Sequence, residues 1–224
     1  MKTIGLGLLT LLWLQSLTQQ PIVQPGPQEP DLLVLLDRLY GLDMESDLAN
    51  PARTNPLSAP GLFRKAGPGP VRYTPEIALG LEVTIRGGFY TNTADSGLPK
   101  KTELWSYRHK STSQDIESNT SLAPKLLEGS AVSFDPGDEA FGLFVSNDQF
   151  QDTVFTQPAA VRVGNKRLAA QPYKAMIYPY HDPKTRSRVP NSFLICWEYS
   201  TNDDFQDVVC RVDNVVLVES TRDD

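Results

Sequence analysis

Short apolar runs rich in β-branched and aromatic residues, separated by polar turns, fill the second half of the chain. The clearest example is Phe193–Val218, in which two such runs flank a polar, acidic connector. This pattern is typical of a strand, a loop and a second strand. We expect further strands in similar runs: Ala78–Ile85, Leu104–Tyr107, Ala131–Phe134, Ala140–Val145, Thr153–Phe155 and Ala175–Tyr178. Many short strands with turns between them predict an all-β protein, an antiparallel β-sandwich of the jelly-roll kind.

A second segment is similar to the acidic connector. Ser146–Phe155 aligns without gaps on Thr201–Cys210, and both carry Asn, Asp, Phe, Gln, Asp and Val at matching places. Two copies are fewer than a repeat fold needs. We therefore expect two similar strand–acidic loop–strand units within one sandwich. Phe150 and Phe205 are expected to point inward and to pin each loop to the core.

The first third of the chain has a different pattern. Leucines at helical spacing predict a short amphipathic helix over residues 31–40, which Asp31 can cap and Gly41 can end. Such a helix either docks on the β domain or lies against a membrane or a partner. Docking is the better interpretation, because the helix lacks a face rich in Lys and Arg. The expected organisation is a Pro-rich linker over residues 21–75 that contains this helix, followed by a β-sandwich domain over residues 76–220.

Residues 1–20 have the pattern of a secretory signal peptide. Lys2 provides the positive start and Ile4–Leu14 an apolar stretch of suitable length. That stretch is too short to cross a bilayer, since a crossing takes about 20 apolar residues. We therefore expect a secreted or periplasmic protein without a transmembrane segment. The net charge of −6 over 224 residues argues against a nucleic-acid partner, because phosphate binding needs a basic field.

The chain has two cysteines, Cys196 and Cys210, and both lie in the Phe193–Val218 unit. If the connector is centred near Asp203, the two residues are directly opposite on paired strands. Opposed positions bring Cβ atoms to about 4.5–5.5 Å, close to disulfide geometry, and an oxidising compartment favours the bond. The alternative is two buried free thiols that act as small apolar side chains.

Carboxylates are concentrated in the two matched loops. Asp203, Asp204 and Asp207 fall within five residues, and Glu198 comes shortly before them. Like charges packed so closely favour a bound cation, and calcium takes about six to eight oxygen ligands with loose geometry. The candidate metal ligands are Asp203, Asp204, Asp207, Glu198, Asp148 and Asp152. The alternative is that these acids are solvated, or are capped by Arg211 or by backbone N–H groups.

Two aromatic pairs have the spacing of one strand face: Trp197 with Tyr199, and Trp105 with Tyr107. Such pairs either stack on sugar rings, as a ligand-binding face, or belong to the core. The sequence has neither an HExxH zinc motif nor a Gly-x-Ser-x-Gly elbow. Glu198 and Asp203 could act as the carboxylate pair of a glycoside hydrolase, in which the two carboxyl groups stand about 5–10 Å apart across a cleft, although a chain with 27 acidic residues offers many such pairs.

From about Ser130 to Val218 the chain resembles a secreted bacterial β-domain family of unassigned function. The resemblance is carried by Trp197-Glu198, a short acidic loop, and Asp204-Phe205-Gln206-Asp207-Val208-Val209, which is similar to the family's Asp-Phe-Asn-Asp-Leu-Val type motif. Gln206 stands where Asn is usual, and Cys196 stands where a small residue is usual. The resemblance implies an exported β domain of the kind often appended to other modules.

The sequence therefore predicts an extracytoplasmic, non-catalytic β-sandwich module with a binding or structural role, stabilised by calcium and directed at carbohydrate or another cell-surface component. The alternative is a carbohydrate-active hydrolase that uses Glu198 and an Asp of the acidic loop.

Overall fold

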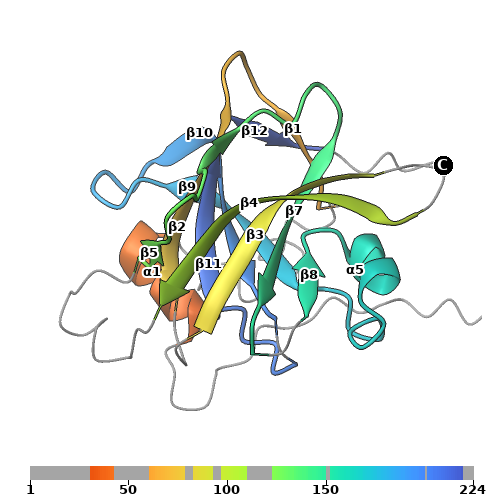
Figure 1. The fold of residues 1–224 in the computed structure, drawn as a ribbon. Coiled ribbons are helices and arrows are strands. Elements are labelled where there is room, and N and C mark those ends of the chain that lie inside the picture. Colours follow the sequence, from red (N-terminus) through yellow and green to blue (C-terminus); the bar gives the residue numbers. More distant parts are fainter. Residues whose placement is uncertain are drawn as a thin grey trace, which may run out of the picture.

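Two antiparallel β-sheets face each other in the computed structural model (Figure 1). The structure describes residues 31–42, 61–78, 83–92, 97–109, 123–149, 152–199 and 201–218. The predicted all-β, sandwich-like fold is confirmed. The predicted signal peptide and the first part of the linker lie outside the described residues.

Sheet A has seven strands, in the order β12-β1-β7-β3-β4-β5, with β8 also paired to β7. Their bounds are β1 Phe63–Lys65, β3 Val83–Asn92, β4 Pro99–His109, β5 Lys125–Leu126, β7 Phe141–Asn147, β8 Thr153–Phe155 and β12 Val215–Leu217. Sheet B has five strands, in the order β6-β2-β11-β10-β9. Their bounds are β2 Val71–Ala78, β6 Ser133–Phe134, β9 Ala175–His181, β10 Arg188–Trp197 and β11 Val208–Asp213. A short helix, α5 (Pro158–Gly164), follows β8.

The domain begins earlier than the predicted boundary near Glu76. Strand β1 and most of β2 lie within the segment predicted to be linker, and they contribute to sheets A and B respectively. Phe63, Val71 and Tyr73 are buried. In β2, buried residues alternate with exposed or half-buried ones up to Ile77, which is the two-residue period of a strand with one buried face. The Pro and Gly residues around these short runs hide that period in the sequence.

The core between the sheets is rich in aromatic side chains. The rings of Tyr73 in sheet B and Trp105 in sheet A are stacked, with centroids 3.8 Å apart. Phe63 of sheet A similarly contacts Phe193 of sheet B at 6.2 Å. Burial of such large apolar surfaces is the main favourable term holding the two sheets together.

Helix α1 (Leu32–Tyr40) has the predicted bounds and is docked on the β domain. The Asp31 carboxylate accepts a hydrogen bond from the Leu33 N–H at 2.7 Å, and the chain turns at Gly41 with a φ of 63°. The apolar face of the helix is buried, with Leu32, Leu35, Leu36 and Tyr40 at 0–3% exposure.

The helix lies on the outer face of sheet B, which points away from sheet A. The Tyr40 and Tyr180 rings meet edge to face, with centroids 5.8 Å apart, and the Tyr40 hydroxyl donates to Glu76 at 3.5 Å. Arg186, in the turn between β9 and β10, donates to the carbonyl oxygens of Asp37 and Arg38 at 3.0 and 2.9 Å. The Asp37 carbonyl also accepts a hydrogen bond from the Gly41 N–H at 2.8 Å, so Arg186 adds further donors to the carbonyls at the C-terminal end of the helix. Within the described ranges, no helix combines the length and the apolar character needed to cross a membrane.

Candidate functional site

The second acidic loop connects β10 to β11 at the end of sheet B. The last rung of the β10–β11 ladder pairs Trp197 with Val208, so the loop begins at Glu198 and closes at Asp207. Asp203 and Phe205 both have positive φ, at 58° and 56°. Non-glycine residues adopt this region at a cost, so the surrounding contacts must hold it. Phe205 is fully buried, which confirms the prediction that its ring points inward; Phe150 lies outside the described residues.

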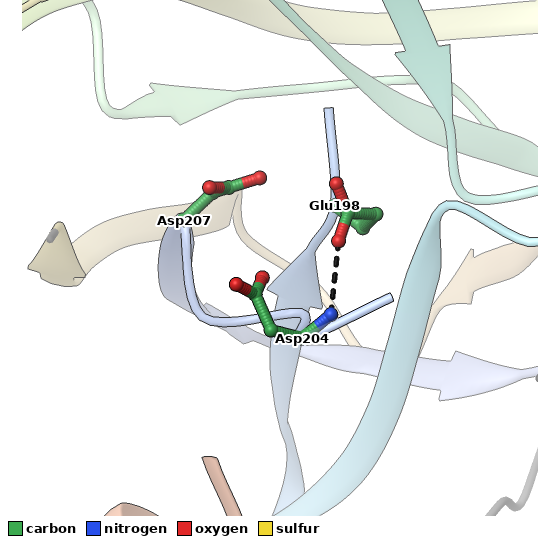
Figure 2. Close-up of side chains that lie close together, drawn as sticks. All are labelled: Glu198, Asp204 and Asp207. Carbon is green, nitrogen blue, oxygen red and sulfur yellow. Dashed lines mark hydrogen bonds between the residues drawn. The ribbon is translucent and has the colours of Figure 1, made fainter. Parts of the chain in front are cut away.

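Three carboxyl groups converge within this loop: Glu198, Asp204 and Asp207 (Figure 2). One ligand oxygen from each lies within 4.8 Å of the others. The Asp204 N–H donates to Glu198 Oε2 at 3.0 Å, and the Tyr199 N–H donates to Asp207 Oδ2 at 3.0 Å. Backbone N–H groups therefore orient two of the three carboxylates. This matches one part of the alternative interpretation, in which backbone groups cap the acids.

Asp204 is the most enclosed aspartate of the cluster, with 1% of its surface exposed. Its Oδ2 accepts hydrogen bonds from the side-chain amides of Asn202 and of Gln206, the latter at 3.5 Å. Its Oδ1 has no hydrogen-bond partner among the described residues. Burial raises the pKa of the Asp204 carboxyl, while hydrogen-bond interactions with Gln206, Glu198 and Asn202 lower it. The group therefore has one oxygen with spare acceptor capacity inside the cluster.

A buried lysine, Lys174, lies beside this cluster. Its side chain is fully buried, and its Nζ stands 3.8 Å from Asp203 Oδ1. Burial lowers the pKa of the Lys174 amine, while the negative charges of Glu198, Asp203 and Asp207 act in the opposite direction. Sequence reasoning missed this residue. Its position depends on the pairing of β9 with β10, which the sequence does not show. This pairing sets Ala175 opposite Trp197 and so brings Lys174 next to Glu198.

The acids of the first loop do not join this cluster. Asp148 is exposed and accepts a hydrogen bond from the Thr84 N–H at 3.0 Å. Asp152 is held by Asn165, at 3.0 Å, and by a salt bridge to Arg167. Asp148 and Asp152 are therefore not among the carboxyl groups that converge at the second loop, and a second, poorer site formed by these two acids stays a prediction. Asp148 is held by a residue of β3, and Asp152 by two residues at and just after the end of α5.

Arg211, the other proposed cap, also has different partners. Its guanidinium donates to Asp213 at 3.1 Å and to the Tyr180 hydroxyl at 2.9 Å, and it lies 3.6 Å from Glu76. It belongs to the polar group beneath helix α1 on the outer face of sheet B. The cation next to the acidic loop is Lys174 instead.

The two predicted aromatic pairs are core residues. Trp197, Trp105 and Tyr107 are 0–1% exposed and Tyr199 is 5% exposed. Trp197 points between the sheets, where its Nε1 donates to Cys210 Sγ at 3.3 Å. The ligand-binding interpretation of these four side chains is therefore wrong, because none of them offers a ring face to a sugar.

Cys196 and Cys210 are free thiols, both buried. The β10–β11 register pairs Ile195 with Cys210 and Cys196 with Val209. Neighbouring residues of a strand point to opposite faces, so Cys210 faces sheet A and Cys196 faces helix α1. The predicted disulfide is wrong because the pairing is shifted by one residue from the assumed one.

Metal-free protein should lose stability through Asp204 as the pH rises. A carboxyl whose folded pKa is raised contributes stability that is complete below its unfolded value, about 3.9, and is lost as pH rises through the folded value. The difference in free energy of unfolding between wild type and Asp204→Asn should therefore fall as the pH rises above about 4. Urea unfolding of both proteins in EDTA at several pH values measures it. A difference that grows with pH would mean that the folded protein lowers this pKa instead.

A scan against protein-family models finds no match, and searches of curated proteins and of solved structures likewise find no similar protein.

Proposed function

We propose that this protein is an extracytoplasmic, non-catalytic β-sandwich module whose β10–β11 loop binds a divalent cation, with calcium as the preferred ion. The observation that carries the proposal is the convergence of Glu198, Asp204 and Asp207 with ligand oxygens within 4.8 Å of one another. Carboxylate oxygens with loose geometry are the ligands that calcium accepts. A cation held by all three would join both ends of the loop and stabilise the module.

The charges around the loop support this proposal. Four carboxyl groups, Glu198, Asp203, Asp204 and Asp207, lie close to one buried ammonium group, that of Lys174. Ionised carboxylates out of water are costly unless they are paired. A divalent ion would add positive charge to that of Lys174 and so offset more of the negative charge of these carboxylates. Half-buried Asp207 and exposed Asn202 lie at the solvent side of the cluster, which gives an ion a way in.

The location and the partner of the module are parts of the same proposal. The basic start and apolar stretch of residues 1–20 support export. The motif Asp204–Val209 supports a relation to exported β domains. Because the predicted aromatic pairs are buried, recognition of a carbohydrate or another cell-surface component would rely on polar groups.

A carbohydrate-active hydrolase remains the second candidate, on the strength of one observation. Burial raises the pKa of Asp204 beside Glu198, and a protonated carboxyl paired with an ionised one is what glycoside hydrolysis needs. Exposures of 0% for Glu198 and 1% for Asp204 weigh against it, since a polysaccharide must reach both groups. Release of reducing ends from a polysaccharide panel, lost in Glu198→Gln, would favour this candidate.

Thermal unfolding of EDTA-stripped protein tests the binding proposal. Calcium at about 100 times its dissociation constant should add about 2.7 kcal/mol, which raises the melting temperature of a domain of this size by about 5–10 °C. Asp204→Asn and Asp207→Asn should each remove most of this rise, whereas magnesium should produce a smaller one because it demands stricter geometry.

The matched control is Asp138→Asn, which removes one charge from an exposed aspartate in the turn between β6 and β7. This variant should keep the full calcium response. A wild-type melting temperature that is the same in calcium and in EDTA would contradict the proposal and leave the acids as partners of Lys174 and of backbone N–H groups.

A further inference from the structure

A lysine with a fully buried side chain needs a reason for its burial. Lys174 precedes β9 and has 0% side-chain exposure, and its Nζ lies 3.8 Å from Asp203 Oδ1. Lysine is almost never fully buried unless it is paired with a negative group. Burial lowers the pKa of the Lys174 amine, and the negative charges of Glu198, Asp203 and Asp207 oppose that effect by favouring the ammonium form. The carboxylates of the loop are thus the reason that this lysine can lie inside the protein.

The position of Lys174 is fixed by the same strand pairing that builds the loop. The Glu198 N–H donates to the Lys174 carbonyl oxygen at 3.1 Å, one step beyond the rung that pairs Ala175 with Trp197. The lysine backbone is therefore hydrogen-bonded to one residue of the carboxyl cluster. Its ammonium group acts as a cation tethered to the edge of the site.

One part of the cluster is nevertheless left for another cation. The Asp204 side chain is 99% buried, points into the space between Glu198 and Asp207 (Figure 2), and its Oδ1 has no hydrogen-bond partner in the part of the chain that the structure describes. A buried carboxylate oxygen without a partner is costly. The lysine therefore compensates the cluster only in part.

We infer that Lys174 is a built-in competitor of the metal: its ammonium group shares the loop carboxylates with the divalent cation and so sets how tightly the site binds calcium. This inference rests on the proposed function. Two cations close to the same carboxylates repel each other, and this repulsion is strong in a medium less polar than water. Calcium binding therefore requires the ammonium group to move away from the cluster or to weaken its contacts there.

Calorimetric titration of calcium into EDTA-stripped Lys174→Met tests the inference at constant pH and ionic strength. Methionine keeps the length and apolar stem of lysine without its charge. We expect the dissociation constant to fall at least tenfold relative to wild type. Without metal, the melting temperature of the variant should be lower than that of wild type, and saturating calcium should close most of the gap. Lys174→Arg, which keeps the charge, should bind calcium within about threefold of wild type.

The matched control is Lys166→Met, which removes the same charge from an exposed lysine between α5 and β9 and should leave calcium affinity within about twofold of wild type. The wild-type and variant titrations separate the two ideas. Equal or weaker binding by Lys174→Met, with normal binding by wild type, overturns the inference and leaves the proposed function standing. Binding by the variant alone supports the inference and overturns calcium binding by the native protein. No binding by either overturns both.

A measurement on the wild-type protein covers the case in which Lys174→Met does not fold. In protein with isotopically labelled lysine, the side-chain signal of Lys174, assigned from the Lys174→Arg spectrum, should shift in proportion to calcium occupancy, while that of Lys166 stays in place. A Lys174 signal that does not move while calcium binds would overturn the inference.

Discussion

Replacing Phe205 by alanine should lower the free energy of unfolding by about 3–5 kcal/mol. The ring is fully buried in the hydrophobic core, and its residue has a positive φ of 56°. Burial of the ring stabilises a loop whose backbone conformation is otherwise unfavourable. Its removal therefore leaves a cavity and also frees the loop that holds the three carboxylates. Urea unfolding of the purified variant measures the loss.

The effect of Phe205→Ala should extend to the site. Because Asp204 and Asp207 flank Phe205 closely in sequence, a loosened loop should also lose its response to calcium in the thermal assay. Phe205→Leu is the control. It retains most of the apolar contact, so its loss in free energy of unfolding should be less than half that of the alanine variant. A loss below about 1 kcal/mol in the alanine variant would show that the ring is not what holds the loop.

Gly88→Ala should destabilise the protein at least as much as Phe205→Ala does, lowering the free energy of unfolding by more than about 3 kcal/mol. Gly88 lies at a β-bulge between β3 and β4, where the register shifts between Gly87 and Gly88. A Cβ at Gly88 would overlap the carbonyl oxygen of Thr102 and lie 3.1 Å from the Cα of Glu103. Because both contacts are backbone, a rotamer change cannot relieve them, and the two strands must separate.

Urea unfolding of Gly88→Ala, together with its soluble yield, measures this cost. Gly67→Ala is the matched control: the nearest atom to its added Cβ is Asn214 Oδ1 at 3.6 Å, an ordinary contact. The control should remain within about 0.5 kcal/mol of wild type. Equal stability of the two variants would contradict the close backbone contact between β3 and β4 at this bulge.

Local patterns in the sequence predict the elements near the site well. The apolar runs on either side of the acidic connector form β10 and β11, and the leucine spacing of residues 31–40 forms α1. In both cases the period of the buried positions decides the structure. The same period does not predict strands β1 and β2, because their apolar positions are few and are interrupted by Pro and Gly.

Which residues meet at the site depends on the register of the strands and on which strands pair with each other, and neither can be read from the sequence. A shift of one residue moves Cys196 to the face opposite Cys210 and removes the predicted disulfide. Lys174 reaches the loop only because β9 pairs with β10. Asp148 and Asp152 match the second loop in sequence, yet Thr84, Asn165 and Arg167 hold them elsewhere.

The placement of the two thiols gives the protein a pair of native chemical reporters. Burial raises the pKa of Cys196 far above its usual value and that of Cys210 to about 12, so alkylation requires each thiol to become exposed. Cys196 lies beneath α1, whereas Cys210 lies between the sheets. Mass spectrometry of pulse-alkylated protein can thus follow detachment of the helix and separation of the sandwich as two events in a single sample.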